Sequence, residues 1–535
     1  MGSNDKTMDY TKVPTKEMLK DLDKEPPPSY GYGVRHVQLI IFFICLTNTF
    51  LTRGHLGVTV VAMTYNPSNP IEKNIDNLSG AVEKYDDKHH PGKVRVRAMK
   101  MDVKVDEEYN STEKVVEILN NTKNKWNVYR SYSWSTPQLE MVLHSFFLGY
   151  FLMMFPGGML CQRWGGKLPL QISLLINGIV SFATPWMAMW GGWKAVCGCR
   201  ILQGMSQAGT FPSIQALLAK WVSTSELATM TSYLYTGTTA GTVIAFQLGG
   251  LLADSRWGWP STFWVVGFIC ILSFIMLTIF GAASPEQHKS ITEEEKDFIS
   301  GGVQTKNLQK RKVPWKGILK TKSVWGTFAA HVGSGVAFVF FFTQVPTFIH
   351  HIYGIDVKSS GLLSSLPYVL SFFTSIGFGL LSDYCTNRKI VTVKTARRVS
   401  NSISQFGIAI MLILSSFATS TGLAVMCLVL GMGLNSAIHT GWMVNHINMT
   451  PNFTSTLMTV GNTLTNTFVL MIPVLASYIV VDVSNPNQWR IMFGLTAALA
   501  LICNALFVIF VSTERQPWDS DDNSTPNENE IKDTK

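Results

Sequence analysis

Long apolar runs alternate with polar segments along the chain. A helix needs roughly 20 apolar residues to cross the hydrocarbon core of a membrane, and twelve runs reach that length. They lie near residues 37–63, 137–160, 168–190, 193–221, 226–252, 259–282, 324–350, 358–381, 399–418, 421–444, 454–481 and 488–512. The pattern predicts an all-α membrane protein with twelve transmembrane helices. Because twelve is even, both termini are expected on one side of the membrane.

The polar segments divide these helices into two sets of six. We expect a tail at 1–36, a first half at 37–282 with a large outer segment at 65–135, a linker at 283–322, a second half at 323–512 and a tail at 513–535. Two related halves with a substrate site between them, near the middle of the membrane, are a common plan of secondary transporters.

A repeated motif follows the second helix of each half. The first copy contains Gly158, Arg163, Gly166 and Lys167, and the second contains Gly379, Asp383 and Arg388. We expect these two loops to latch the cytoplasmic face, since they occupy corresponding places in the two halves.

The placement of charge predicts the orientation. Only 15% of the residues are charged, whereas soluble proteins carry about a quarter. The net charge of +9 includes Lys and Arg in the short loops after the second, sixth and eighth helices, which marks that face as cytoplasmic, with both termini. We therefore expect no nucleic-acid partner. Asn77, Asn110 and Asn120 begin N-x-S/T sequons in the segment predicted to lie outside, and we expect them to be glycosylated.

Two arginines interrupt apolar runs, Arg53 in the first predicted helix and Arg200 in the fourth. A charge inside the membrane is costly and usually serves function, although a side chain near a helix end can reach the interface instead. Two guanidinium groups without carboxylates beside them in sequence would make a positive cavity. The substrate is therefore expected to be a small anion, which a guanidinium binds through paired hydrogen bonds.

Amide side chains accompany these charges. Gln203 and Gln207 follow Arg200 on one helix face, and the tenth helix carries Asn435 and His439 one turn apart. We assign these four side chains to substrate binding. The alternative is that they join neighbouring helices by hydrogen bonds.

A co-transported cation needs its own ligands. Asn462 and Asn466, one turn apart on the eleventh helix, could donate oxygens to Na⁺. Glu140 and His144 are candidates to titrate if the cation is a proton, with His331 and His439 as further candidates. No nucleophile–base pair or metal constellation is evident, so neither an enzyme nor a cofactor is expected.

Six motifs in order resemble the anion:cation symporter family, a branch of the major facilitator superfamily. They are Ser145–Tyr150 with Phe155–Gly158 and Arg163–Lys167, Arg200–Gly204 with Thr210–Pro212, Lys220-Trp221, Leu363–Tyr368, Val444–His446 with Thr450–Phe453, and Glu514–Trp518. The family includes sialin, the vesicular glutamate transporters and the type I sodium–phosphate cotransporters. The chain is most similar to its invertebrate inorganic phosphate cotransporters.

The resemblance implies a twelve-helix major facilitator fold and alternating access. Arg53 and Arg200 match the two arginines that the family uses for its anion. Proton-coupled relatives carry a glutamate where this chain has Gln207 and a histidine where it has Gln215. The seventh-helix arginine of the glutamate transporters corresponds to about Ser334. These departures favour Na⁺-coupled or potential-driven movement over proton coupling, and phosphate over glutamate.

Several alternatives remain open at this point. The substrate could be an organic anion such as an acidic sugar, an acidic amino acid or urate, and the chain could be a sensor that does not transport. The lack of a clear acidic dileucine signal favours the plasma membrane over lysosomal or vesicular membranes, and the fold usually acts as a monomer. Pro27-Pro28-Ser29-Tyr30 fits the P-P-x-Y pattern that WW domains bind.

Overall fold

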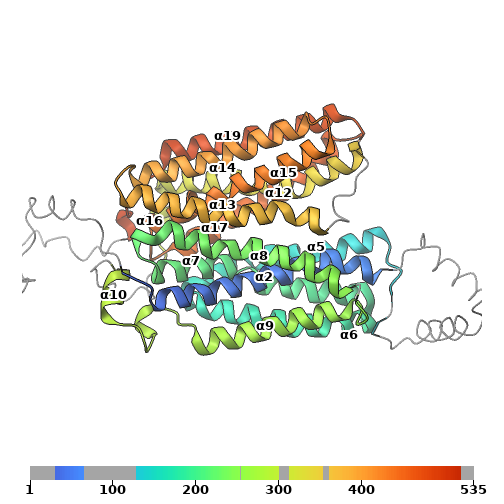
Figure 1. Ribbon diagram of the computed structural model, residues 1–535, viewed down its shortest axis with the longest axis horizontal. Helices are drawn as coiled ribbons and strands as arrows, with labels where there is room; N and C mark the ends of the chain where they lie inside the picture. The colour runs from blue at the N-terminus through green and yellow to red at the C-terminus, as the bar shows by residue number, and fades with distance from the viewer. Residues whose placement is uncertain are drawn as a thin grey trace, which may run out of the picture.

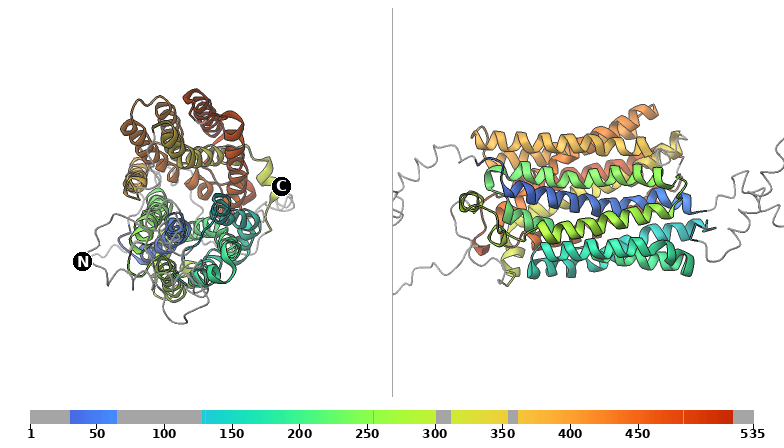
Figure 2. Two further views of the ribbon diagram at one scale, coloured as in Figure 1. Left: turned by 90° about the vertical axis from the view of Figure 1, so that its right-hand side faces the viewer. Right: turned by 60° about the horizontal axis from the view of Figure 1, so that its bottom comes forward.

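A computed structural model describes residues 30–64, 128–129, 131–253, 255–300, 312–353, 361–482 and 484–519. These residues are almost entirely helical. The helices form two bundles that lie side by side, one from each half of the chain (Figures 1 and 2). The all-α fold with two helical halves is therefore confirmed.

The first bundle is built from long apolar helices. They are α2 (Val34–Met63), α5 (Thr136–Trp164), α6 (Lys167–Gln207), α7 (Thr210–Trp221), α8 (Leu227–Ala253) and α9 (Pro260–Phe280). Gly192 divides α6 into two helices, because its φ of 59° and ψ of −148° lie outside the helical region. Only glycine adopts such a backbone without strain, so the turn between the third and fourth predicted helices falls at this residue.

The second bundle contains two interrupted helices. Its elements are α12 (Lys322–Tyr353), α13 (Gly361–Asn387), α14 (Val393–Ser416), α15 (Thr421–Asn435), η3 (Ser436–His439), α16 (Trp442–Met449), α17 (Thr454–Val469), α18 (Met471–Ile479) and α19 (Pro486–Phe510). The tenth predicted helix is thus broken into α15, η3 and α16, and the eleventh is divided into α17 and α18. Breaks of this kind inside a membrane occur where the backbone is enclosed by protein.

Ten candidate membrane spans are found among the described residues. One of them, at 167–221, is 55 residues long, which is enough for two crossings. The 27-residue helix α8 is absent from these ten spans, since its many Thr and Gly residues lower its hydropathy, yet it runs alongside α2 (Figure 1). Counting 167–221 as two crossings and adding α8 gives the twelve helices predicted from sequence.

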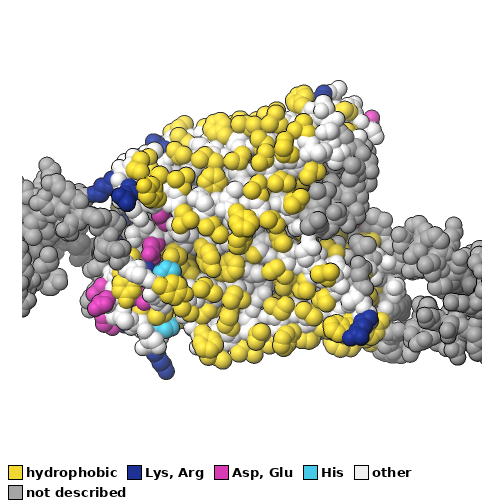
Figure 3. Space-filling model, viewed as in Figure 1, with side chains coloured by type: hydrophobic (Ala, Val, Ile, Leu, Met, Phe, Trp, Pro, Cys, Tyr) yellow, Lys and Arg dark blue, Asp and Glu magenta, His cyan; other side chains and the backbone are white. Residues whose placement is uncertain are grey.

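The surface agrees with a membrane environment. Apolar side chains cover the middle of the face in Figure 3, and most charged side chains gather at the end where α10 (Glu293–Ser300) lies. Phe268, Leu272 and Ile279 of α9 are more than half exposed, which is costly in water and favourable in lipid. The end with α10 is the one predicted to be cytoplasmic.

A buried ion-pair cluster ties the linker to the first bundle at this end. The guanidinium of Arg35, which is 1% exposed, lies 2.9 Å from Glu226 and 3.2 Å from Glu295. The carboxylate of Glu295 also accepts hydrogen bonds from the backbone N–H groups of Val34 and Arg35, at the start of α2. These bonds satisfy N–H groups that a helix start otherwise leaves unpaired, so α10 caps α2.

Several sequence predictions fall outside the described residues. The three sequons at Asn77, Asn110 and Asn120 lie there, as do the first three residues of the P-P-x-Y pattern. Its last residue, Tyr30, is described: its hydroxyl lies 2.9 Å from the hydroxyl of Thr292 in the linker.

Candidate functional site

The two predicted arginines meet in the first bundle. Arg200 of α6 is 4% exposed, and its guanidinium lies 3.4 Å from the backbone carbonyls of Thr52 and Arg53 on α2. Arg53 is partly buried and reaches back toward α6, 3.4 Å from the amide oxygen of Gln207. The structure therefore brings Arg53 and Arg200 together.

An aromatic ring lies between the two guanidinium groups. The centre of the Phe146 ring, on α5, is 5.1 Å from Cζ of Arg53 and 4.9 Å from Cζ of Arg200. Phe50 and Tyr150 flank Arg53 at 4.7 Å and 4.9 Å. The face of an aromatic ring attracts a cation without cancelling its charge, whereas a carboxylate would cancel it. The rings therefore hold the two guanidinium groups and leave their positive charge uncompensated.

Amide side chains orient the arginines. The amide oxygen of Gln203 accepts a hydrogen bond from Arg200 at 3.0 Å, and its nitrogen donates to Ser181 at 3.1 Å. Gln207 donates to the side-chain oxygen of Asn177 at 2.9 Å while its own oxygen faces Arg53. The predicted pair Gln203 and Gln207 is thus at the site, where it fixes the arginines from behind.

The charge of the site is unbalanced. Among the described residues, no carboxylate forms an ion pair with Arg53 or Arg200, and the Nε atom of each is buried without a hydrogen-bond partner. Buried charges in proteins are normally paired because removing an ion from water is expensive. Two guanidiniums side by side without an ion-pair partner therefore leave positive charge uncompensated at this place.

Close helix packing places these groups within reach of one another. Gly149 of α5 lies against the backbone carbonyl of Ile201, and Gly204 of α6 lies against the backbone carbonyl of Phe146. A Cβ atom at either glycine would overlap the facing carbonyl, so both positions need glycine. Small residues allow helices to approach closely in membranes, and here they bring the Phe146 ring onto the guanidinium of Arg200.

The second bundle reaches the site through α17. The amide of Asn462 donates to the hydroxyl of Tyr150 at 3.0 Å, and Tyr150 contacts Arg53. Asn466 donates to the backbone carbonyl of Asn462 at 2.9 Å and lies 3.8 Å from the sulfur of Met154. The two predicted cation ligands therefore lie at the interface of the bundles, beside the arginine site.

Four predicted residues make their contacts with groups other than the arginines. His439 is 2.7 Å from the hydroxyl of Ser375 and stacks on Tyr235, while Asn435 accepts a hydrogen bond from Ser404. They sit where η3 contacts α13, α8 and α14. Glu140 and His144 lie at the outer end of α5, mostly exposed, and pair with each other at 3.3 Å.

The second copy of the repeated motif bridges the two bundles at the end where α10 lies. The carboxylate of Asp383, on α13, accepts hydrogen bonds from the backbone N–H groups of Ala228 at 3.1 Å and Thr229 at 2.7 Å. These groups begin α8, so the negative charge also meets the positive end of the helix dipole. Gly379, one turn earlier, packs directly on Ser232 of α8.

The first copy makes a related but uncharged bridge. Gln162 of α5 donates to the carbonyl of Asn452 at 2.9 Å and accepts from Ser455 at 2.5 Å, at the start of α17. Gly158, one turn earlier, packs against Thr459. Sequence reasoning did not single out Gln162, although it sits between the predicted Gly158 and Arg163.

The remaining motif residues act within one bundle or face outward. Lys167 donates to the carbonyl of Gly281 at 2.7 Å, at the end of α9. Gly166 packs against the backbone of Ser213, and Arg163 and Arg388 are exposed. Of the predicted motif residues, Gly158, Gly379 and Asp383 therefore join the bundles.

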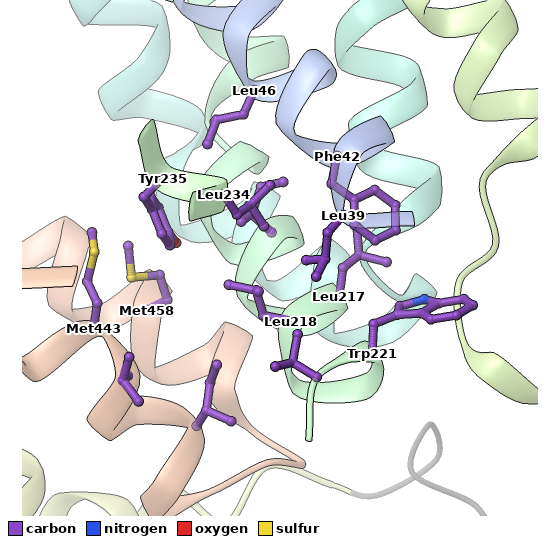
Figure 4. Packing of buried hydrophobic residues seen from close by; sticks show 14 of the residues in the cluster. Leu39, Phe42, Leu46, Leu217, Leu218, Trp221, Leu234, Tyr235, Met443 and Met458 are labelled. Carbon is purple, nitrogen blue, oxygen red and sulfur yellow. The ribbon is translucent and has the colours of Figure 1, made fainter. Parts of the chain in front are cut away.

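Apolar side chains continue the closure above these bridges. Leu234 and Tyr235 of α8 belong to the same buried cluster as Met443 and Met458 of the second bundle (Figure 4). The ring of His439 lies 5.4 Å from that of Tyr235, nearly parallel to it. The bundles are thus closed against each other between the arginine site and the end where α10 lies.

The aromatic residues around the arginines were missed as site residues. Phe146 and Tyr150 are one turn apart on α5, on the face that meets α6, and the spacing was visible in the sequence. An aromatic residue in an apolar run looks the same whether it faces lipid, a helix or a ligand, so the spacing alone did not assign it.

Comparisons with known proteins agree with this geometry. The profile of the Major Facilitator Superfamily matches residues 119–472. A Drosophila melanogaster protein named "Putative inorganic phosphate cotransporter" is 30% identical over 94% of this chain and 90% of its own length. Human sialin is 28% identical over 73% of this chain and 78% of its own length. Vesicular glutamate transporter 2 of Bos taurus is 27% identical over 72% of this chain and 67% of its own length.

A solved structure supports the fold. The human organic anion transporter MFSD10 superimposes with a TM-score of 0.56 over 88% of this chain and 99% of its own, at 13% identity. The fold and the paired arginines define a multi-pass membrane transporter, not an enzyme. The chain belongs to the anion:cation symporter family of the Major Facilitator Superfamily.

Proposed function

We propose that this protein moves a small anion, inorganic phosphate first among the candidates, across the membrane together with a cation. The observation that carries the proposal is the pair of buried guanidiniums without carboxylate partners among the described residues. A tetrahedral oxyanion offers several oxygens to two such groups and cancels their charge. The name of the Drosophila relative supports phosphate, and those of sialin and MFSD10 support organic anions as the rival substrates.

Transport proceeds by alternating access. The Asp383 and Gln162 bridges hold the cytoplasmic ends of the bundles together, and we call these two bridges the cytoplasmic gate. The anion enters from the outer side, binds Arg53 and Arg200, and is released inward when the gate parts. A hinge of this kind fits the two-bundle plan, because the contacts that break lie between rigid units.

The test is uptake of labelled inorganic phosphate into proteoliposomes that contain the purified protein. Uptake is measured with Na⁺ or choline outside, with and without an acid-outside pH gradient, and with sialic acid, glutamate or urate as competitors. Saturable phosphate uptake supports the proposal. Absence of phosphate uptake under every condition refutes phosphate as substrate, and absence of flux for all four anions refutes transport itself.

A matched pair of variants tests the arginine site. Arg200→Lys keeps the charge but removes the planar fork, and we expect uptake to fall about tenfold or more. Arg256→Lys changes an exposed arginine that lies over the ring of Trp257 and should leave uptake unchanged. Equal uptake by the two variants would remove Arg200 from the binding site.

The cellular setting completes the proposal. We place the protein in the plasma membrane as a monomer, with both termini in the cytoplasm and sugars on Asn77, Asn110 and Asn120. Glycosidase treatment of the expressed protein and of a variant with all three asparagines changed to Gln tests the outer position of 65–135. An unchanged electrophoretic mobility of the wild type would place that segment on the other side or leave it unmodified.

A further inference from the structure

Two histidines face each other in the interior of the second bundle, away from the arginine site. His331 of α12 is 5% exposed and His446 of α16 is fully buried. Their ring centres are 6.3 Å apart at an angle of 66°. His331 also stacks on Trp442, with ring centres 3.9 Å apart. We call His331 and His446 the imidazole pair.

Three of the four ring nitrogens of the imidazole pair are buried without a hydrogen-bond partner among the described residues. Within the part of the chain that the structure describes, neither ring nitrogen of His446 nor Nδ1 of His331 has a partner. The neighbouring N–H donors are engaged elsewhere, since Trp442 donates to Ser334 at 3.0 Å and the side-chain nitrogen of Asn445 donates to Thr327 at 3.1 Å, whereas the side-chain oxygen of Asn445 is buried without a partner among the described residues. Buried polar atoms are nearly always hydrogen-bonded. Three unpartnered ring nitrogens on two facing histidines therefore indicate a site that takes up a small polar species.

Other titratable groups of the bundle interior are less suited to that role. His439 is hydrogen-bonded to Ser375, and Glu140 and His144 pair with each other at the surface. His55 is also buried with both ring nitrogens unpartnered, but it lies one turn from Thr52, whose carbonyl the guanidinium of Arg200 approaches. His55 therefore belongs to the arginine site itself, whereas the imidazole pair lies outside it.

The charged groups around the imidazole pair are few. The helices α15 and α17 carry no charged residue, and α19 carries only Arg490, at its outer end. On α14, Arg397 is buried and donates to the carbonyl of Thr440 and to Ser382, near Asp383. Lys316 and Lys320 of α11 lie at the cytoplasmic end, where Asp519 pairs with Arg515. Among the described residues of these elements, no carboxylate faces the imidazole pair.

One helix separates the imidazole pair from the arginine site. Gly461 of α17 lies against His331, and a Cβ atom added there would be 2.5 Å from Nδ1. The next residue, Asn462, donates to Tyr150, whose ring faces Arg53. Charge on one side of α17 therefore acts on the other through a low-dielectric interior with little screening.

We infer that His331 and His446 form the proton-binding site that couples proton movement to anion movement, an inference that rests on the proposed function. The proton adds to a nitrogen lone pair of the imidazole pair, and no other bond changes. In the empty protein the charges of Arg53 and Arg200 oppose a further positive charge nearby. A bound anion cancels those charges and raises the proton affinity, and by thermodynamic linkage the bound proton raises the anion affinity equally.

This assignment replaces the expectation of sodium. That expectation rested on Gln207, an amide that cannot carry a proton, at the place where proton-coupled relatives have a glutamate. The structure offers a titratable pair in the other bundle, so the amide at Gln207 does not exclude proton coupling.

The experiment compares gradient-driven uptake with exchange in proteoliposomes of the full chain. His331→Gln and His446→Gln remove the titrating group, and His288→Gln is the matched control because His288 lies in the linker between the bundles, outside the membrane-spanning helices. An acid-outside gradient should drive accumulation of labelled inorganic phosphate by the wild type and by the control. Either pair variant should lose this accumulation about tenfold or more, yet keep phosphate-for-phosphate exchange at equal pH. Comparison at identical pH cancels the titration of phosphate itself.

A second measurement needs no histidine variant. Phosphate solution of matched pH is added to the purified wild type in unbuffered detergent, and proton uptake is followed with a pH dye. We expect the pH to rise as phosphate binds, and no rise for Arg200→Ala, which cannot bind it. No rise for the wild type overturns the proton site.

The outcomes separate the two proposals. A wild type that shows neither uptake nor exchange of phosphate refutes the proposed function. Three other outcomes refute the proton site and leave the proposed function standing. They are exchange that proceeds while the pH gradient has no effect, uptake that needs Na⁺ but not the gradient, and accumulation that survives in both pair variants.

Discussion

Replacing Asp383 by Asn should weaken the cytoplasmic gate. The carboxylate accepts two backbone N–H groups, at 3.1 Å and 2.7 Å, and is 7% exposed. Hydrogen bonds to a charged group contribute about 1.5–3 kcal/mol each, whereas neutral ones contribute about 1 kcal/mol. Asn keeps the shape but offers one oxygen and no charge to the helix start, so we expect the closed state to lose about 2 kcal/mol.

A change of about 2 kcal/mol shifts the ratio of closed to open states about thirtyfold, at 1.36 kcal/mol for each factor of ten. Spin labels on the cytoplasmic ends of α8 and α13 report this ratio as a distance distribution in liposomes. The control is Asp482→Asn, an exposed carboxylate that accepts a bond from Ser484. Identical distributions for wild type and Asp383→Asn would refute the view that this carboxylate holds the gate.

Three further changes test other parts of the structure. Gly204→Ala places a Cβ on the backbone of α5, so we expect lost phosphate uptake and a lower melting temperature in detergent, whereas a wild-type melting curve would contradict the close packing. Arg35→Ala leaves Glu295 buried without its cation and should lower the free energy of unfolding by about 3 kcal/mol, measured by thermal denaturation. Tyr150→Phe removes the hydroxyl that accepts from Asn462 and should lower the uptake rate about fivefold, the equivalent of one hydrogen bond of about 1 kcal/mol; an unchanged rate would separate this bond from transport.

The helices were predictable because lipid imposes a simple rule on the sequence. An apolar run of sufficient length must be a helix there, since its backbone groups find no other partners. The break in the tenth helix was not predictable by this rule, because the run at 421–444 stays apolar on average while η3 interrupts it. The rule depends on the mean hydropathy of a run. A helix break that is enclosed by protein hardly changes that mean.

The candidate site was predictable only where charge made it conspicuous. Arg53 and Arg200 stood out against apolar neighbours, and the structure brings them together. Phe146 did not stand out, because its role depends on a neighbouring helix that only close packing supplies. His331 and His446 are 115 positions apart in the sequence, and their facing geometry depends on the way α16 leaves the broken helix. Local pattern carries no information on such long-range contacts.

The uneven division of the arginine site between the bundles has a consequence for the balance of the cycle. Arg53, Arg200, Phe146 and Gln203 all belong to the first bundle, and α17 contributes one bond, from Asn462 to Tyr150. A ligand shifts a conformational equilibrium only by its difference in affinity for the two states. A bound anion that leaves most of its contacts unchanged barely favours either state. The half-saturation constants on the two faces of the membrane should therefore be similar, and the loaded carrier should not be trapped facing either way.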